Sequence, residues 1–288
     1  VQTFTRPSGQ GNYQVAAGET PLDHTFRDTR LQLNAQWSQP LNETDNSSIG
    51  VHLSKEYDYL SVGFNGSISR DINRKNTTLS AGLAYSHDII DPEGGRPVAF
   101  AAMAKSKDER INDDEFKQTR LSGNGNKDII DLLIGVTQVI NRRMIMQFNY
   151  SYSYNDGYLT DPFKLLSLVD QQGLTQNLLF ENRPRQRRKQ SFYWQSKYHF
   201  NQLVTDLSYR YMTDDWAIDS HTTDVKFRYL LNDDRYLEPH LRYYQQDKAH
   251  FYRPFLNQGE ALPAFASADY RIGEMSAYTV GVKFGMTL

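Results

Sequence analysis

The chain has 288 residues with 34 acidic and 32 basic side chains, a formal net charge of -2, and no cysteine. The lack of cysteine excludes disulfides, thiolate metal sites and covalent haem attachment, and the near-neutral charge gives no overall reason to expect a nucleic-acid partner. No run approaches the roughly 18 consecutive apolar residues that a membrane helix needs, so the chain can cross a membrane only as a closed β-barrel.

Alternation of apolar and polar residues, the sequence signature of β-strands, is the dominant pattern along the chain. It predicts about eleven antiparallel strands separated by turns and loops. In chain order, we expect these strands at residues 28–40, 47–57, 59–72, 76–89, 127–141, 143–156, 189–200, 202–214, 220–231, 236–248 and 273–286.

The segment that follows Arg143 shows the alternation most clearly. Residues 144, 146, 148, 150, 152 and 154 are all methionine, phenylalanine or tyrosine, whereas the residues between them are mostly serine, asparagine or glutamine. In a soluble sandwich, the apolar face would pack against a second sheet. In a membrane barrel it would face lipid, and the polar face would line the lumen.

The lengths of the connections favour the barrel. Short turns are expected near residues 73–75, 141–142, 201 and 232–235, and long segments at 90–126, 157–188 and 249–272. Membrane barrels have short periplasmic turns and long extracellular loops. We therefore predict an all-β fold in which residues 1–288 form one domain, an antiparallel up-and-down transmembrane β-barrel. Its long extracellular loops are expected near 1–27, 90–126, 157–188 and 249–272.

The expected strand number has a further implication. Bacterial single-chain barrels have an even number of strands, and eleven is odd. We therefore expect the chain to be part of a barrel of 14–16 strands, incomplete at both ends.

Several short stretches resemble one family. They are Val15–Glu19, Phe26–Arg30, Lys55–Tyr59, Asn73–Ser80, Gly135–Val139, Gly157–Pro162, Tyr209–Tyr211, Asp214–Trp216, Phe251–Arg253 and Ser267–Arg271. Together they resemble an uncharacterised proteobacterial outer-membrane β-barrel family, known only as a domain of unknown function. The resemblance covers nearly the whole chain and implies a Gram-negative outer-membrane location and further strands on either side.

Members of that family tend to be encoded beside a flavin transferase, a thioredoxin-like protein and a small lipoprotein, which implies a redox or export system. The resemblance supplies no activity, cofactor or site residues.

The strands expected between residues 189 and 248 carry many charges on their polar face. These residues are Lys197, His199, Asp206, Arg210, Asp224, Lys226, Arg228, Glu238, His240 and Arg242. Such a wall could favour anionic solutes in a lumen, or it could be a cross-strand ladder of ion pairs that fills and stiffens the interior. The strands at 59–89 carry serine, glycine and alanine instead, which leaves space for water or for an inserted loop.

A basic run lies where the second long loop meets a strand. Its cations are Arg183, Arg185, Arg187, Arg188 and Lys189. In an outer-membrane protein they could contact lipopolysaccharide phosphates, which arginine binds bidentately, or they could simply be solvated. An acidic stretch at 108–115 could hold a divalent cation, although it lacks the spacing of a calcium loop.

The seven histidines are scattered, so the sequence nominates no catalytic residue, no metal site and no cofactor, and we expect a protein that is not an enzyme.

The loops at 157–188 and 249–272 contain many apolar residues, which must be buried in the lumen, over the barrel mouth or against a partner. Two functions remain. The first is a porin-like diffusion channel with a charged, partly cationic lumen. The second is a plugged structural or interaction barrel that anchors a lipoprotein, a surface appendage or a partner of a redox system. The expected partners are outer-membrane lipid, lipopolysaccharide and a lipoprotein or surface protein, and no nucleic acid.

Overall fold

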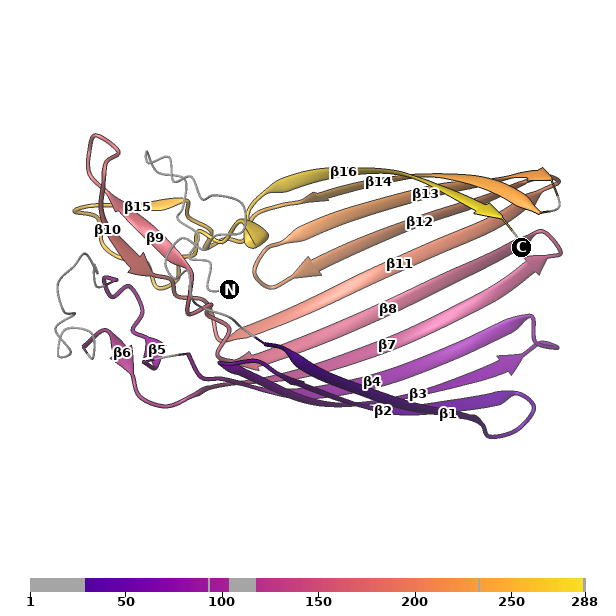
Figure 1. Cartoon of the computed structure of the whole chain (residues 1–288), viewed down its shortest axis with the longest axis horizontal. Helices are drawn as coiled ribbons and strands as arrows, with labels where there is room; N and C mark the ends of the chain where they lie inside the picture. The colour runs from indigo at the N-terminus through magenta and orange to yellow at the C-terminus, as the bar shows by residue number, and fades with distance from the viewer. Residues whose placement is uncertain (1–28, 93, 104–117, 233, 287–288) are drawn as a thin grey trace.

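One curved antiparallel sheet of eleven strands forms most of the protein (Figure 1). The computed structural model describes residues 29–92, 94–103, 118–232 and 234–286. The strands of the sheet are β1 (Leu31–Pro40), β2 (Asp45–Lys55), β3 (Tyr59–Ile72), β4 (Thr77–Ile90), β7 (Gly125–Asn141), β8 (Met144–Gly157), β11 (Gln186–Phe200), β12 (Leu203–Asp214), β13 (Asp219–Asn232), β14 (Arg235–Gln246) and β16 (Met275–Met286). They are neighbours in chain order, as in an up-and-down barrel wall.

The alternation in the sequence therefore predicted the sheet correctly. The segment expected at 59–72 coincides with β3, and the other bounds differ by a few residues. Five short strands were not predicted because each has too few residues to show a period. They are β5 (Arg96–Pro97), β6 (Arg120–Leu121), β9 (Leu165–Val169), β10 (Thr175–Phe180) and β15 (Phe255–Asn257).

The strand register places like side chains on the same face of the sheet. Phe64 on β3 opposes Tyr85 on β4, which opposes Ile130 on β7, and all three are exposed. On the other face, Ser61 opposes Ser54 and Asp88, and all three are buried. We call these the apolar face and the polar face. Side chains crowd together on the inside of a curved sheet, and here the polar side chains are the more buried ones, so the polar face is the concave one.

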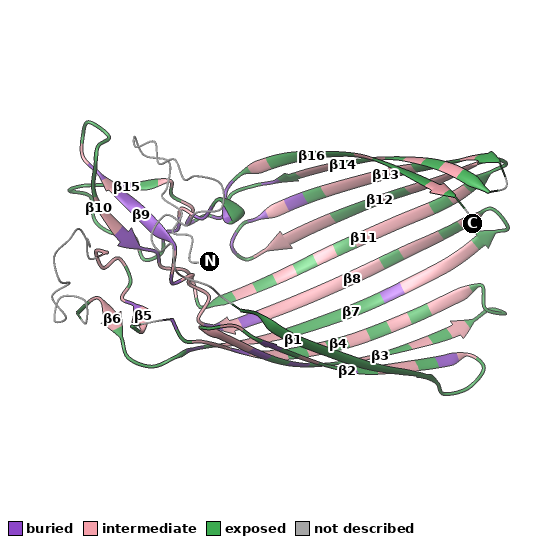
Figure 2. Cartoon of the chain, viewed as in Figure 1, coloured by how far each residue is buried: buried purple, intermediate pink, exposed green. Residues whose placement is uncertain are grey.

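Figure 2 shows the resulting alternation of more and less exposed residues along the strands. Among the described residues, no second large sheet covers the apolar face, because the other two sheets have three and two strands. The described residues therefore do not form a sandwich.

All the long connections lie at one end of the sheet (Figure 1). At the turn end, short turns occupy 41–44, 73–76, 142–143, 201–202 and 233–234. Asn73, Arg74 and Lys75 have positive φ values of 53°, 54° and 64°, a left-handed conformation suited to a tight hairpin. At the loop end lie the long connections that follow β4, β8 and β14, together with two short ones at 56–58 and 215–218. The long connections therefore lie together at one end, whereas short connections occur at both ends. The expected loop at 1–27 lies outside the described residues.

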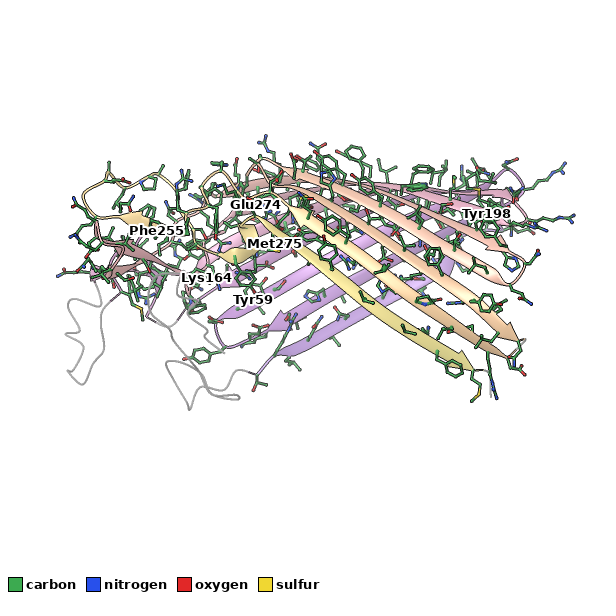
Figure 3. The ribbon with its side chains drawn as sticks, turned by 90° about the horizontal axis from the view of Figure 1, so that it is seen from above. Tyr59, Lys164, Tyr198, Phe255, Glu274 and Met275 are labelled. Atoms are coloured by element: carbon green, nitrogen blue, oxygen red, sulfur yellow. The ribbon has the colours of Figure 1, made fainter. Side chains whose placement is uncertain are left out.

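The described strands do not close into a barrel. Strands β1 and β16 each pair on one side only, so the sheet has two free edges. Figure 3 shows how the sheet curves between these edges, with Tyr198 near the turn end and Phe255 at the loop end.

Candidate functional site: the polar face and the cap

Small side chains line the first part of the polar face. A shallow hollow of about 320 Å³ there is lined by residues of β3, β4, β7 and β8 that include Ser67, Gly82, Ala84, Asp131 and Ser153. Nearer the loop end, Asp88 accepts a hydrogen bond of 2.6 Å from the hydroxyl of Tyr59 and forms a 2.9 Å ion pair with Lys127. This part of the wall is polar, with few charges and little bulk.

The second part of the polar face, on β11 to β16, is densely charged. The register places Lys197 opposite Asp206, Asp206 opposite Lys226, and Lys226 opposite His240. The Lys197 ammonium lies 3.4 Å from the Asp206 carboxylate. The structure therefore places these residues on one face of neighbouring strands, because period 2 fixes the face and tight hairpins fix the register.

Neighbouring charges complete a ladder of ion pairs. Asp224 lies 2.7 Å from His240 and 3.6 Å from Lys226, and Arg228 lies 2.6 Å from Glu238. His199 is exposed near the turn end, and two strands separate it from His240, so these histidines do not form a common site.

Two arginines of the polar face form no ion pair with the described residues. Arg210 lies over the ring of Tyr193, with its guanidinium carbon 5.3 Å from the ring centroid. Arg242 opposes Asp224 in the register, but that carboxylate is engaged by His240 and Lys226. Arg210 opposes Thr222, which opposes Tyr244, so Arg242 lies two residues further toward the turn end in the register.

The long loops pack together into a small unit at the loop end, which we call the cap (residues 95–103, 118–124, 158–185 and 247–274). Its sheet has β9 in the centre, antiparallel to β10 and parallel to β15. Leu166, Leu179, Leu256 and Ala266 form one buried cluster. A second cluster joins Trp216 and Ile218, from the turn between β12 and β13, to Ala249, Phe251 and Ile272. The apolar loops thus bury their side chains against one another, beyond the ends of the long strands (Figure 1).

A buried ionic network joins two loops of the cap, 158–185 and 247–274. Arg183 donates to Asp269 at 2.8 Å and to Glu181 at 3.1 Å, and both carboxylates are inaccessible to solvent. Arg271 binds Asp269 and reaches Asp161 at 2.9 Å. Ser267 donates a short hydrogen bond to Glu181. The network therefore links residues 161–183 to residues 267–271.

Electrostatics differ between the two buried acids. Burial raises the pKa of Glu181 above its ordinary value, although Arg183 and Ser267 oppose the shift. Burial also disfavours ionisation of Asp269, but hydrogen bonds from Arg271 and the charge of Arg183 outweigh it and lower the pKa to about 2. Both pKa shifts arise because the two acids are enclosed between the same two loops.

The structure divides the basic run and so corrects the prediction of one five-residue lipopolysaccharide contact. Arg183 is buried in the cap network, and Arg187 pairs with Asp214 at 2.6 Å while stacking on Trp216. Lys189 opposes Ser153 on the polar face. The two exposed cations of the run are Arg185 and Arg188. Nothing in the run itself distinguishes its buried members, because their partners come from distant segments.

Metal and helix features add little. The described residues contain no group of three histidine, aspartate or glutamate side chains that could hold a metal ion. The acidic stretch at 108–115 lies outside the described residues. No helix in the described part of the chain is long and apolar enough to cross a membrane.

Solved structures with a similar fold are bacterial outer-membrane proteins. The siderophore receptor PirA from Acinetobacter baumannii matches with a TM-score of 0.55 at 9% identity, over 91% of this chain and 41% of that one. A mutant of the ferric enterobactin receptor PfeA from Pseudomonas aeruginosa matches with a TM-score of 0.51 at 8% identity, over 87% and 37%. The outer membrane channel DcaP of Acinetobacter baumannii reaches a TM-score of 0.45 at 10% identity, over 74% and 56%, which is too low to support an inference.

These identities show a likeness of fold alone, and the chain spans between 37% and 56% of the length of these three proteins. No curated protein matches the chain. The description "Protein of unknown function (DUF3570)" belongs to a family that matches residues 1–288, and the chain is a member of that family.

Proposed function

We propose that the chain forms part of the wall of a closed outer-membrane barrel through which small anionic solutes diffuse. The apolar face would contact lipid and the polar face would line a water-filled lumen, as in barrels of this class. The loop end would be extracellular and the turn end periplasmic. Closure would satisfy the free edges of β1 and β16, which lipid could not solvate.

The observation that carries the choice of solute is the excess of cations on the polar face of β11 to β16. Eight cations lie there, at Arg187, Lys189, Lys197, Arg210, Lys226, Arg228, Arg242 and Lys283, with four carboxylates at Asp206, Asp214, Asp224 and Glu238. The ion pairs engage all four carboxylates and leave four of the cations without one among the described residues, at Lys189, Arg210, Arg242 and Lys283. Fixed cations in a confined aqueous path lower the energy of anions and raise that of cations.

The reversal potential of the full-length protein in a planar bilayer under a potassium chloride gradient tests this proposal. We expect discrete conductance steps and a reversal potential that indicates preference for chloride. The double variant Arg210→Gln/Arg242→Gln should reduce this preference while the steps persist. Arg74→Gln, in the turn at 73–76, is the matched control and should change it little. Preference for potassium, or equal effects of the two variants, would contradict the assignment of the wall.

A second function is favoured by the cap. Two loops with their own apolar clusters and a buried ionic network form an ordered surface, as expected of a barrel that anchors a lipoprotein, a surface appendage or a redox partner. A protein that gives no conductance and retains a specific partner through detergent purification would support this function over the channel. Neither proposal assigns catalysis to the chain.

A further inference from the structure

A shallow groove crosses the apolar face of the sheet. It has a volume of about 390 Å³ and is lined mainly by Ile134, Val136, Phe148, Tyr150, Phe192 and Trp194. The register places these side chains in two successive rows across the strands. Ile134 opposes Tyr150, which opposes Phe192, and Val136 opposes Phe148, which opposes Trp194. The groove is thus the gap between two rows of large side chains on β7, β8 and β11, and its volume lies within the range of ligand sites.

Polar side chains lie above the groove, toward the loop end. The Tyr150 hydroxyl donates to the side-chain oxygen of Gln190 at 3.0 Å. Arg188 is the next residue of β11 on the same face, exposed and with its guanidinium 5.7 Å from the ring centroid of Tyr154. Four residues of strand separate Arg188 from Phe192, a distance of about 13 Å at ~3.3 Å per residue. The apolar groove therefore ends in a cation at the loop end.

Arg188 forms no ion pair among the described residues, although Asp156 opposes Gln186 nearby. Its donors therefore stay available, and the planar guanidinium matches the oxygens of a phosphate. Arg185, three residues earlier, continues the ladder through its backbone bond to Gly157, so the alternation places it on the opposite face, with Arg187.

We propose that this surface binds one molecule of the lipid A part of lipopolysaccharide, with a phosphate at Arg188 and an acyl chain in the groove. A phosphorylated, acylated glycolipid fits because its charge and its hydrocarbon are separated in the same sense as the cation and the groove. The site rests on the outward placement of the loop end in the proposed function, but it does not require conduction. It replaces the five-residue contact expected from the sequence with one of those residues and an apolar groove.

Native mass spectrometry of the full-length protein, titrated with diphosphoryl lipid A in detergent, tests the site. We expect one molecule to bind at least tenfold more tightly than dephosphorylated lipid A or phosphatidylglycerol. The variant Arg188→Gln should weaken binding about tenfold or more. Ile134→Trp, which fills the groove without changing charge, should weaken it as well.

The matched control is Arg143→Gln, which removes one exposed cation at the turn end and should leave binding unchanged. The proposal is overturned if this control weakens binding as much as the loop-end variant, if the dephosphorylated lipid binds equally well, or if phosphatidylglycerol competes on equal terms. Mobility in cold SDS checks that each variant keeps its barrel. Because conduction is measured separately, failure of this site would leave the channel proposal standing.

Discussion

Replacement of Arg183 by methionine is the sharpest perturbation of the cap. The side chain bridges Glu181 and Asp269, whose carboxylates are wholly inaccessible to solvent. Methionine keeps much of the volume but removes the charge and every donor. Removal of one partner from a buried ionic cluster leaves an uncompensated charge and costs about 3–5 kcal/mol.

The structure indicates the lower part of that range at neutral pH. Asp269 would keep its hydrogen bonds from Arg271, of 2.8 and 3.0 Å. Glu181 would keep only Ser267 and the amide of Asp161 and could avoid the burial of its charge by taking up a proton. We therefore expect a cost near 3 kcal/mol, which corresponds to a cap that opens about a hundredfold more often. The cost should shrink on mild acidification, because a protonated Glu181 no longer needs a counter-ion.

Hydrogen exchange of the full-length protein measures this opening directly. The amides of Asn182 and Ala266 donate to each other's carbonyls across the two loops and are the reporters. Their protection should fall about a hundredfold in Arg183→Met and less in Arg183→Lys, whereas the amides of β8 keep theirs. Unchanged protection at Asn182 and Ala266 would refute the view that the network holds the loops together.

Three further outcomes follow from the fold. The folded-state pKa of Asp269, about 2 against an ordinary 3.8, predicts a contribution of at most about 2 kcal/mol to cap stability that is complete above pH 4 and is lost as pH falls through 2. The raised pKa of Glu181 has the opposite sign, so cap exchange, corrected for the intrinsic rate, should not accelerate between pH 7 and pH 4. Gly157→Ala should abolish the heat-modifiable band in SDS gels, because the φ of Gly157 is +124° and a Cβ there would lie 2.1 Å from the Asn126 carbonyl oxygen. Gly173 has open space around it, so Gly173→Ala should cost only about 1–2 kcal/mol of stability. Trp216→Ala should destabilise the cap by about 3–5 kcal/mol in denaturant titrations, and Trp37→Ala on the exposed apolar face should not.

The long strands could be predicted because their pattern is local. Along β8 apolar and polar residues alternate, because successive side chains point to opposite faces and one face must avoid water. The same alternation places the charged residues on one face. A tight turn such as 201–202 also leaves little freedom of register between β11 and β12. The alternation therefore placed Lys197 and Asp206 on the same face of neighbouring strands, and their ion pair is a finding of the structure.

The cap could not be predicted in the same way. The pairing of β9 with β15, and of Arg183 with Asp269, joins segments far apart in the chain with no repeating pattern to align them. Apolar content indicated that the loops at 157–188 and 249–272 must be buried, but not that they would pack against each other. The burial of Arg183 could not be predicted from the basic run for the same reason, because it depends on acids that lie outside the run.

Labelling of single cysteines along β8 tests the central claim, that this sheet is a barrel wall with lipid on one face and water on the other. The chain has no cysteine of its own, so each substitution gives one reactive site. In lipid vesicles, a hydrophilic maleimide should label Gln147→Cys and Asn149→Cys through the lumen and leave Phe148→Cys and Tyr150→Cys unmodified. Equal labelling of all four positions, or the reverse pattern, would contradict the account.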